Sequence, residues 1–135
     1  MSTMTIAKLA RAGGVGVETV RYYQRRALLR EPPRSPGGGI SGGIRRYDAA
    51  DLRRLRFIRA AQTAGFTLDE IGALLQFDAT DDRARAHHLA QGRLRALDQK
   101  IAELQTARAA LKRLAQACCE TTAGPCPILT AFDEA

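Results

Sequence analysis

The sequence predicts a mainly α-helical fold with a winged helix-turn-helix domain over residues 1–77, one long helix over residues 81–118 and a C-terminal loop and tail over residues 119–135. Three observations support this expectation. Apolar residues recur at helical spacing through most of the 135 residues. A heptad seam runs through the second half of the chain. All 3 cysteines lie at or beyond the end of that seam.

The first two expected helices form a helix-turn-helix. The first begins after Thr5, a residue type that caps helices, and ends at the glycine-rich stretch 13–17. The second covers residues 18–26, with Val20 and Tyr23 facing inward. In such a unit the second helix enters the major groove of DNA. Its polar positions are therefore the expected DNA contacts: Thr19, Arg21, Tyr22, Arg25 and Arg26.

A wing is expected after the second helix. Residues 31–43, EPPRSPGGGISGG, cannot be helical, and residues 44–47 follow as a short extended run. A hairpin with a basic tip would place Arg45 and Arg46 on the DNA backbone, and we include Tyr47 in this contact set. The alternative is a flexible loop.

Two further helices are expected before the long one. Asp48 begins a helix to about residue 64, and its apolar face is Leu52, Leu55, Phe57, Ile58 and Ala61. Thr67 and Glu70 form the capping box of the next helix, residues 68–77. The core positions of that helix are Ile71, Leu74 and Leu75.

The long helix predicts a homodimer. Its seam alternates spacings of four and three residues through Ala90, Leu94, Leu97, Ile101, Leu104, Arg108, Leu111, Ala115 and Cys118. A helix of about 37 residues is roughly 55 Å long. No other segment of the chain can cover such a seam, so we expect it to pair with a second copy. Arg108 is the one charged residue in the seam.

Basic residues are concentrated in the first half of the chain. The whole chain has 21 Lys and Arg residues against 14 Asp and Glu, for a formal net charge of +7. Residues 1–62 contain 13 basic and 4 acidic residues, whereas residues 63–135 contain 8 and 10. A basic helix-turn-helix module is typical of a protein that binds double-stranded DNA. The alternative is ordinary solvated surface charge.

Several classes of protein are not expected. No run approaches 18 apolar residues and no secretory signal is present, which predicts a cytoplasmic protein with no membrane partner. The stretch GGGISGG lacks the Lys-Ser/Thr pair of a phosphate-binding loop, and no nucleophile–base motif is present. The sequence therefore does not predict an enzyme.

The cysteines predict a soft-metal site. The long helix delivers Cys118 and Cys119 at its C-terminal end, and Gly124 and Pro125 can turn the chain so that Cys126 returns toward them. Two or three converging thiolates favour a soft metal ion, and the partial negative charge of a helix C-terminus raises the pKa of such thiols. One alternative is a redox sensor in which Cys118 or Cys119 forms a disulfide with Cys126. Another is a regulator whose cysteines sense nothing.

Four stretches of the chain resemble the MerR family of transcriptional regulators. They are TIAKLARAGGVGVETVRYYQRRALLREP, IRRYDAADLRRLRFIRAAQTAGFTLDEIGALL, IAELQ, and CC with CPIL around the last cysteine. The first two are most similar to the mercury-sensing branch. The resemblance implies a winged helix-turn-helix, an antiparallel coiled-coil dimer and a metal-binding loop. It also implies that metal binding makes the dimer bend and untwist a promoter with an overlong spacer, so that RNA polymerase can use it.

Three departures from the family pattern concern the metal and the wing. Sensors of divalent ions carry a cysteine at the start of the dimerisation helix, where this chain has Arg83. Seven residues separate Cys118 from Cys126, as in the copper, silver and gold branch. The wing segment is longer than usual. The resemblance implies Hg(II) as the first effector, held by Cys118, Cys119 and Cys126, and Cu(I), Ag(I) or Au(I) as the second.

Two histidines near the start of the long helix, His87 and His88, are expected to be surface or packing residues. In an antiparallel dimer the start of one long helix approaches the end of the other. Participation of these histidines in a site completed across the dimer therefore stays open.

Overall fold

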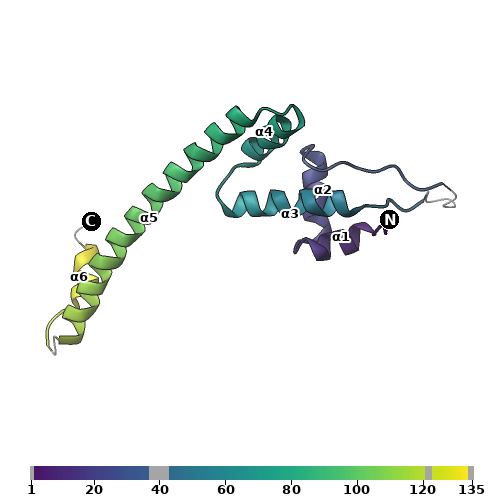
Figure 1. Cartoon of the computed structure of the whole chain (residues 1–135). Coiled ribbons are helices and arrows are strands. Elements are labelled where there is room, and N and C mark those ends of the chain that lie inside the picture. Colours follow the sequence, from purple (N-terminus) through teal and green to yellow (C-terminus); the bar gives the residue numbers. More distant parts are fainter. Residues whose placement is uncertain (1, 37–42, 121–122, 134–135) are drawn as a thin grey trace. The chain divides into compact units, whose positions relative to one another are not determined.

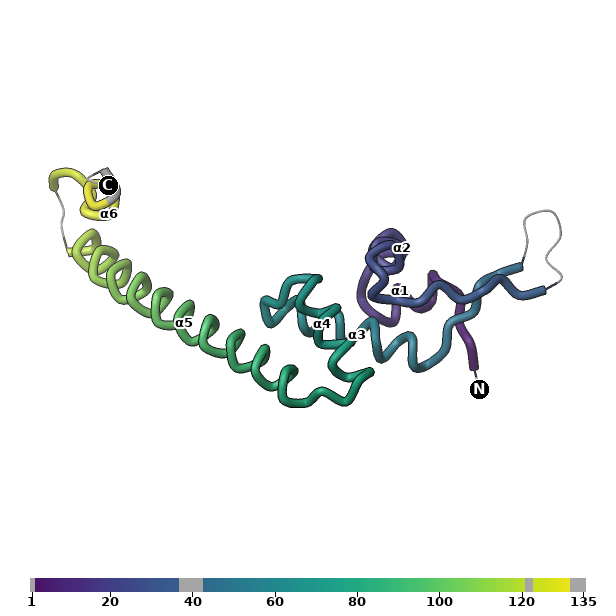
Figure 2. The backbone as a smooth tube through the Cα atoms, turned by 90° about the horizontal axis from the view of Figure 1, so that it is seen from above, coloured from purple at the N-terminus to yellow at the C-terminus, as the bar shows by residue number. Residues whose placement is uncertain are grey.

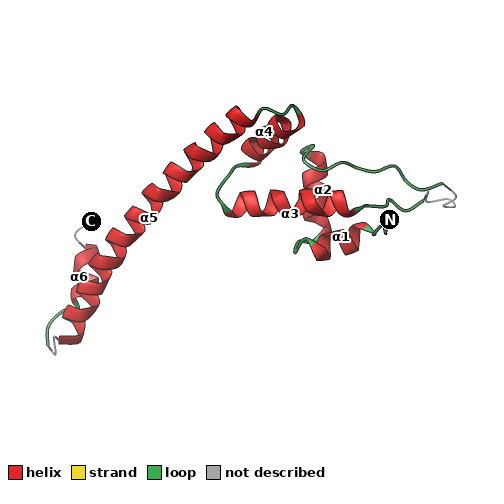
Figure 3. Ribbon diagram, in the orientation of Figure 1, coloured by secondary structure: helices red, strands yellow, loops and turns green. Residues whose placement is uncertain are grey.

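The structure is a computed structural model, and it describes residues 2–36, 43–120 and 123–133. Its helices are α1 (Ile6–Ala12), α2 (Val17–Arg25), α3 (Ala49–Thr63), α4 (Leu68–Ala79), α5 (Arg83–Glu120) and α6 (Pro127–Asp133). Figure 3 shows helices and loops, and no strand, in this part of the chain. The mainly helical fold is therefore confirmed. Two compact units, Met1–Ala90 and Gln91–Ala135, divide within α5, so the expected three-part division stays a prediction.

Helix α1 and helix α2 form the expected helix-turn-helix. The hydroxyl of Thr5 accepts a hydrogen bond from the backbone N–H of Lys8 at 3.3 Å, which confirms the predicted cap. Gly14 has a φ of 73°, in the left-handed region that favours glycine, and it turns the chain after α1. Helix α2 begins at Val17, one residue earlier than expected, and buries Val20 and Tyr23 as predicted.

Helices α3 and α4 both begin with a capping box. The pairs are Asp48 with Asp51, and Thr67 with Glu70 as predicted. The apolar face of α3 contributes Leu55, Ile58 and Ala61 to the core, but Phe57 is 39% exposed. Phe57, also expected on the apolar face, lies about 100° around the helix from its neighbour Ile58 and outside the buried core.

The buried core lies in the unit Met1–Ala90. Residues of α1, α2, α3 and α4 and of the chain between α2 and α3 contribute to it. It is made of Leu9, Ala10, Val20, Tyr23, Leu28, Leu29, Tyr47, Leu55, Ile58, Ala61 and Ile71. Helix α1 packs against both α2 and α3. The approach of α1 to α3 is close, since a Cβ built on Gly13 would lie 2.3 Å from Cδ2 of Leu55. A side chain at position 13 would therefore displace the buried Leu55.

The wing, residues 31–47, has an outgoing leg (31–36) and a returning leg (43–47) that lie side by side (Figure 2). An isolated antiparallel bridge joins Arg34 to Arg45, and a second joins Met4 to Tyr47. The described legs are thus paired at single positions rather than as strands. The glycine-rich tip, residues 37–42, lies outside the described residues.

Helix α5 contains 38 residues and buries none of them in this single chain. Four large apolar residues of the predicted seam are exposed: Leu94, Ile101, Leu104 and Leu111. This exposure is what an unpaired coiled-coil helix would show. The homodimer stays a prediction, because the structure contains one chain.

Helix α6 corrects the expectation that the C-terminal segment is only a loop. Figures 1 and 2 both show it beside the last turns of α5. Pro127 is its first residue, a position that tolerates a missing N–H. The carbonyl of Cys126 accepts hydrogen bonds from the backbone N–H of Thr130 at 3.1 Å and from its hydroxyl at 2.9 Å.

No helix of the described chain has the length and apolar character needed to cross a bilayer.

Candidate nucleic-acid interface and thiol site

Helix α2 carries two exposed arginines of the expected DNA-contact set. Arg21 forms an ion pair with Glu18 at 2.8 Å. The guanidinium carbon of Arg25 lies 5.8 Å from the centre of the Tyr22 ring. Both contacts are on the surface, where an ion pair contributes little free energy, so these side chains can turn to an anion at small cost.

Two other members of the set are more constrained. Arg26 donates to the hydroxyl of Tyr22 at 3.0 Å and to Asp69 at 2.8 Å, which ties α2 to the start of α4. Thr19 is half-buried. Arg26 therefore has a structural role in this chain as well as the expected role in DNA binding.

A hollow of about 520 Å³ lies between the start of α1, helix α2 and both legs of the wing. Four arginines line it: Arg21, Arg25, Arg34 and Arg45. Such a concentration of guanidinium groups suits the phosphates of a nucleic acid, which accept their paired N–H donors. Sequence reasoning missed Arg34, because its place beside the hollow follows from its pairing with the returning leg.

The three wing residues of the expected set have different environments. Arg45 donates to the carbonyl of Pro32 at 2.8 Å and forms an ion pair with Glu31 at 3.1 Å. Arg46 is exposed. Tyr47 is only 1% exposed but also lines the hollow, so its contact with DNA stays a prediction. Its ring belongs to the core because the returning leg alternates exposed and buried residues as it enters α3.

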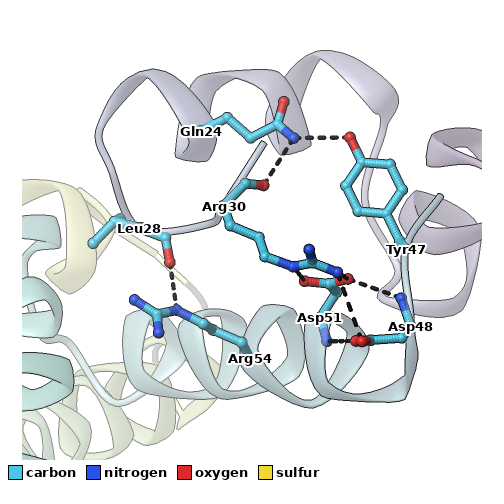
Figure 4. Close-up of polar contacts among 7 residues, drawn as sticks. All are labelled: Gln24, Leu28, Arg30, Tyr47, Asp48, Asp51 and Arg54. Carbon is cyan, nitrogen blue, oxygen red and sulfur yellow. Dashed lines mark hydrogen bonds and ion pairs between the residues drawn. The ribbon is translucent and has the colours of Figure 1, made fainter. Parts of the chain in front are cut away.

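A polar network holds the base of the wing (Figure 4). The guanidinium of Arg30 donates to both carboxylate oxygens of Asp51, each at 2.7 Å. Asp51 also accepts the backbone N–H of Asp48 at 2.8 Å. Burial alone raises the pKa of Asp51, but the hydrogen bonds from Arg30 and Asp48 outweigh it and lower that pKa below its ordinary value. Arg54 donates to the carbonyl of Leu28 at 2.7 Å, which attaches the chain after α2 to α3.

The thiol site joins the end of α5 to the start of α6. The Sγ atoms of Cys118 and Cys126 lie 3.2 Å apart, and both side chains are half-buried. Their hydrogen bond and burial raise the pKa of Cys118. The hydrogen bond from Cys118 and the backbone N–H groups of Leu129 and Ile128 lower the pKa of Cys126. The expectation that the helix end raises all three pKa values is therefore wrong for Cys126, which faces the first turn of another helix.

The pair is suited to a soft metal ion. Thiolate ligands favour thiophilic ions over magnesium or calcium. Two sulfurs on opposite sides of an ion, each about 2.3 Å from it, would lie about 4.6 Å apart. The two cysteines are thus close enough to share one ion after the loop between them widens slightly.

Within the part of the chain that the structure describes, no site of three or more ligands is assembled. Cys119 is exposed, and the described residues contain no cluster of three His, Cys, Asp or Glu side chains that could hold an ion. Arg83 is exposed and forms an ion pair with Asp81 at 3.5 Å. His87 lines a hollow of about 730 Å³ with Phe57 and other residues of the unit Met1–Ala90. The three-thiolate set stays a prediction, and participation of His87 or His88 stays open.

Comparison with known proteins identifies close relatives over nearly the whole chain. Residues 4–78 match the model of the MerR HTH family regulatory protein, and residues 52–114 match the model described as MerR, DNA binding. The mercuric resistance operon regulatory protein of Shigella flexneri is 42% identical over 118 residues, which cover 87% of this chain and 78% of that protein.

Two solved structures share the fold. The regulator PbrR691 from Ralstonia metallidurans CH34, in complex with lead(II), has a TM-score of 0.69 at 31% identity, with 96% of this chain and 98% of that chain covered. The dual function transcriptional regulator MerR from Bacillus megaterium MB1, in complex with mercury(II), has a TM-score of 0.68 at 30% identity and the same coverage.

Proposed function

The chain belongs to the MerR family of transcriptional regulators, which are not enzymes, and we propose that it activates a resistance or efflux promoter in response to a thiophilic metal ion. The observation that carries this proposal is the approach of Cys118 to Cys126 at 3.2 Å in a chain whose other compact unit is a basic helix-turn-helix. The thiol pair is the proposed sensor. The arginine-lined hollow is the proposed DNA interface.

The proposed DNA interface combines α2 with the wing. Arg21 and Arg25 would enter the major groove with α2, while Arg45 and Arg46 would contact the backbone. Helix α5, with its exposed seam, would pair with a second copy and present two such interfaces to one promoter. The effector would bias the dimer toward a state that bends and untwists the DNA so that RNA polymerase can use the promoter.

The proposed ligands of the effector are Cys118 and Cys126, with Cys119 as a third thiolate for ions that take three. Hg(II) is the first proposal, because the chain is 42% identical to a mercuric resistance regulator. Cu(I), Ag(I) and Au(I) are the second, because the structure brings two thiols together rather than three. A bound soft ion supplies a strong link between the ends of α5 and α6.

The test is a set of three serine variants, assayed for metal stoichiometry of the reduced protein and for transcription from the target promoter. Cys118→Ser and Cys126→Ser should abolish induction and leave DNA affinity nearly unchanged. Cys119→Ser is the matched control, since it replaces the neighbouring exposed thiol. It should preserve a two-thiolate response and weaken a three-thiolate one. Full induction of the Cys126→Ser protein by both Hg(II) and Cu(I) would rule out the tail as the sensor.

The 3.2 Å separation also favours a second candidate, a redox-sensing regulator. Here a peroxide would oxidise Cys118 and Cys126 to a disulfide and be reduced to water and, for an organic peroxide, an alcohol. Induction by peroxide in metal-depleted cells, lost in both Cys118→Ser and Cys126→Ser, would favour this function over metal sensing.

A further inference from the structure

Arginines of both wing legs and of α2 line one hollow, so the relation between the legs and α2 sets how these arginines lie relative to each other. Gln24 lies on the same helix as Arg21 and Arg25, and it lines the arginine-lined hollow together with them. Its side chain points toward Arg30, just before the outgoing leg, and Tyr47, at the end of the returning leg (Figure 4). We call these two residues the leg bases. The position of this one amide therefore concerns the geometry of the whole interface.

Gln24 uses its amide nitrogen toward both legs. The Nε2 group donates to the hydroxyl of Tyr47 at 2.8 Å, where the returning leg ends. The same nitrogen donates to the carbonyl of Arg30 at 3.2 Å, just before the outgoing leg begins. A glutamine amide has two N–H donors, so Arg30 receives one of them and Tyr47 receives the other.

The same leg bases are held from the opposite side by α3. Arg30 is bound through Asp51, which belongs to the first turn of α3. Tyr47 is packed in the core immediately before α3 begins. The contacts to α3 fix the legs to the domain, and those of Gln24 add a direct link from the legs to α2.

From this geometry we propose that Gln24 is a positioning residue, which sets the wing relative to α2 so that both contact the same DNA duplex. The proposal rests on the proposed DNA-binding function. Gln24 itself need not touch DNA, since its donors are already occupied by Tyr47 and Arg30. Its effect on affinity acts through the wing arginines, of which Arg46 is exposed.

The first test is independent of DNA and uses amide hydrogen exchange of the full chain. Gln24→Met keeps the length of the side chain but removes both donors. It should accelerate exchange at the backbone N–H of Ser35, which donates to Ile44 across the legs, by about fivefold or more. Gln62→Met is the matched control, because Gln62 accepts a bond from the hydroxyl of Tyr23, away from the wing. Equal exchange at Ser35 in both variants would overturn the proposal.

The second test is a double-mutant cycle on promoter DNA with Gln24→Met and Arg46→Ala. In the native background Arg46→Ala should lower affinity about tenfold and reduce the slope of log K against log salt by about 0.9, the contribution of one phosphate contact. In the Gln24→Met background the same change should lower affinity less than twofold, because the wing is already misplaced. An equal loss in both backgrounds would show that Gln24 does not act through the wing. Failure of the native chain to bind DNA would instead contradict the proposed function, and the hydrogen-exchange result would still decide the role of Gln24.

Discussion

The carboxylate of Asp51 should contribute more to stability than any other acidic side chain of the DNA-binding unit. Asp51 is 6% exposed, accepts two hydrogen bonds of 2.7 Å from Arg30 and closes the capping box of α3. The variant Asp51→Ala removes all of these contacts at once. The perturbation therefore breaks the link between the base of the wing and α3 without changing any residue proposed to contact DNA.

The expected loss is about 2–4 kcal/mol in the free energy of unfolding. Hydrogen bonds to charged groups contribute about 1.5–3 kcal/mol net. The variant also removes the bond from the backbone N–H of Asp48, but it keeps the cap, because Asp48 accepts the backbone N–H of residue 51. Breaking a fully buried ion pair costs about 3–5 kcal/mol, but the side chain of Arg30 is 53% exposed and stays hydrated when its partner is removed. Asp51→Asn keeps one acceptor and should lose about half as much.

The pH dependence of the free energy of unfolding gives a second check on the role of Asp51. The pKa of Asp51 is lower in the folded chain than its ordinary value of about 3.9. A depressed pKa contributes stability above the unfolded value, and this contribution is lost as the pH falls through the folded value. The difference in stability between the native chain and Asp51→Asn should therefore be constant from about pH 7 to pH 5 and shrink below about pH 4.

The assay is urea unfolding followed by circular dichroism at several pH values, with Asp69→Asn as the control. Asp69 also pairs with an arginine, but its side chain is 92% exposed, so its loss should cost less than about 1 kcal/mol. A loss below about 0.5 kcal/mol for Asp51→Ala would refute the reasoning. So would a stability difference for Asp51→Asn that does not change between pH 5 and pH 3.

Three other outcomes are expected. Gly13→Ala should destabilise the chain by about 1–3 kcal/mol, measured by urea unfolding, because its Cβ would meet buried Leu55. The double variant Leu97→Asp with Leu104→Asp should sediment as a monomer, whereas a native chain that is already monomeric would contradict the proposed dimer. Arg21→Ala should weaken promoter binding by about 1–3 kcal/mol, and native affinity should fall steeply with salt in titrations; a flat salt dependence would contradict phosphate contacts.

Local signals in the sequence were sufficient to predict where three of the helices begin. Thr5, Asp48 and Thr67 cap α1, α3 and α4 as predicted, because a cap depends on residues only three positions apart. The seam of α5 is equally local, since the heptad spacing defines one face of a helix. These features do not depend on how the elements pack.

The features that the sequence did not indicate are set by packing between segments. Tyr47 is in the core and Phe57 is half-exposed, because the positions of α1 and α2 decide which side of the returning leg and of α3 is covered. Helix α6 has seven residues, as α1 does, but it follows Cys126 rather than a capping residue such as Thr5, so the sequence carried no cap signal for it. The lowered pKa of Cys126 follows first from its hydrogen bond with Cys118 and then from backbone N–H groups of α6, and both depend on how α6 returns to the end of α5.

The short helix α6 also suggests how the sensitivity of such a regulator can be adjusted without changing a ligand. Cys126 stands where it does because α6 is folded, and its carbonyl bonds with Thr130 belong to the first turn of that helix. Each time α6 frays, one of the two sulfurs leaves the site, so the apparent affinity equals the intrinsic affinity multiplied by the fraction of time that the helix is formed. An isolated helix of this length is marginal in water. Because alanine has the highest helix propensity, replacing the exposed Ala131 would therefore raise the effector concentration at half-response through helix propensity alone.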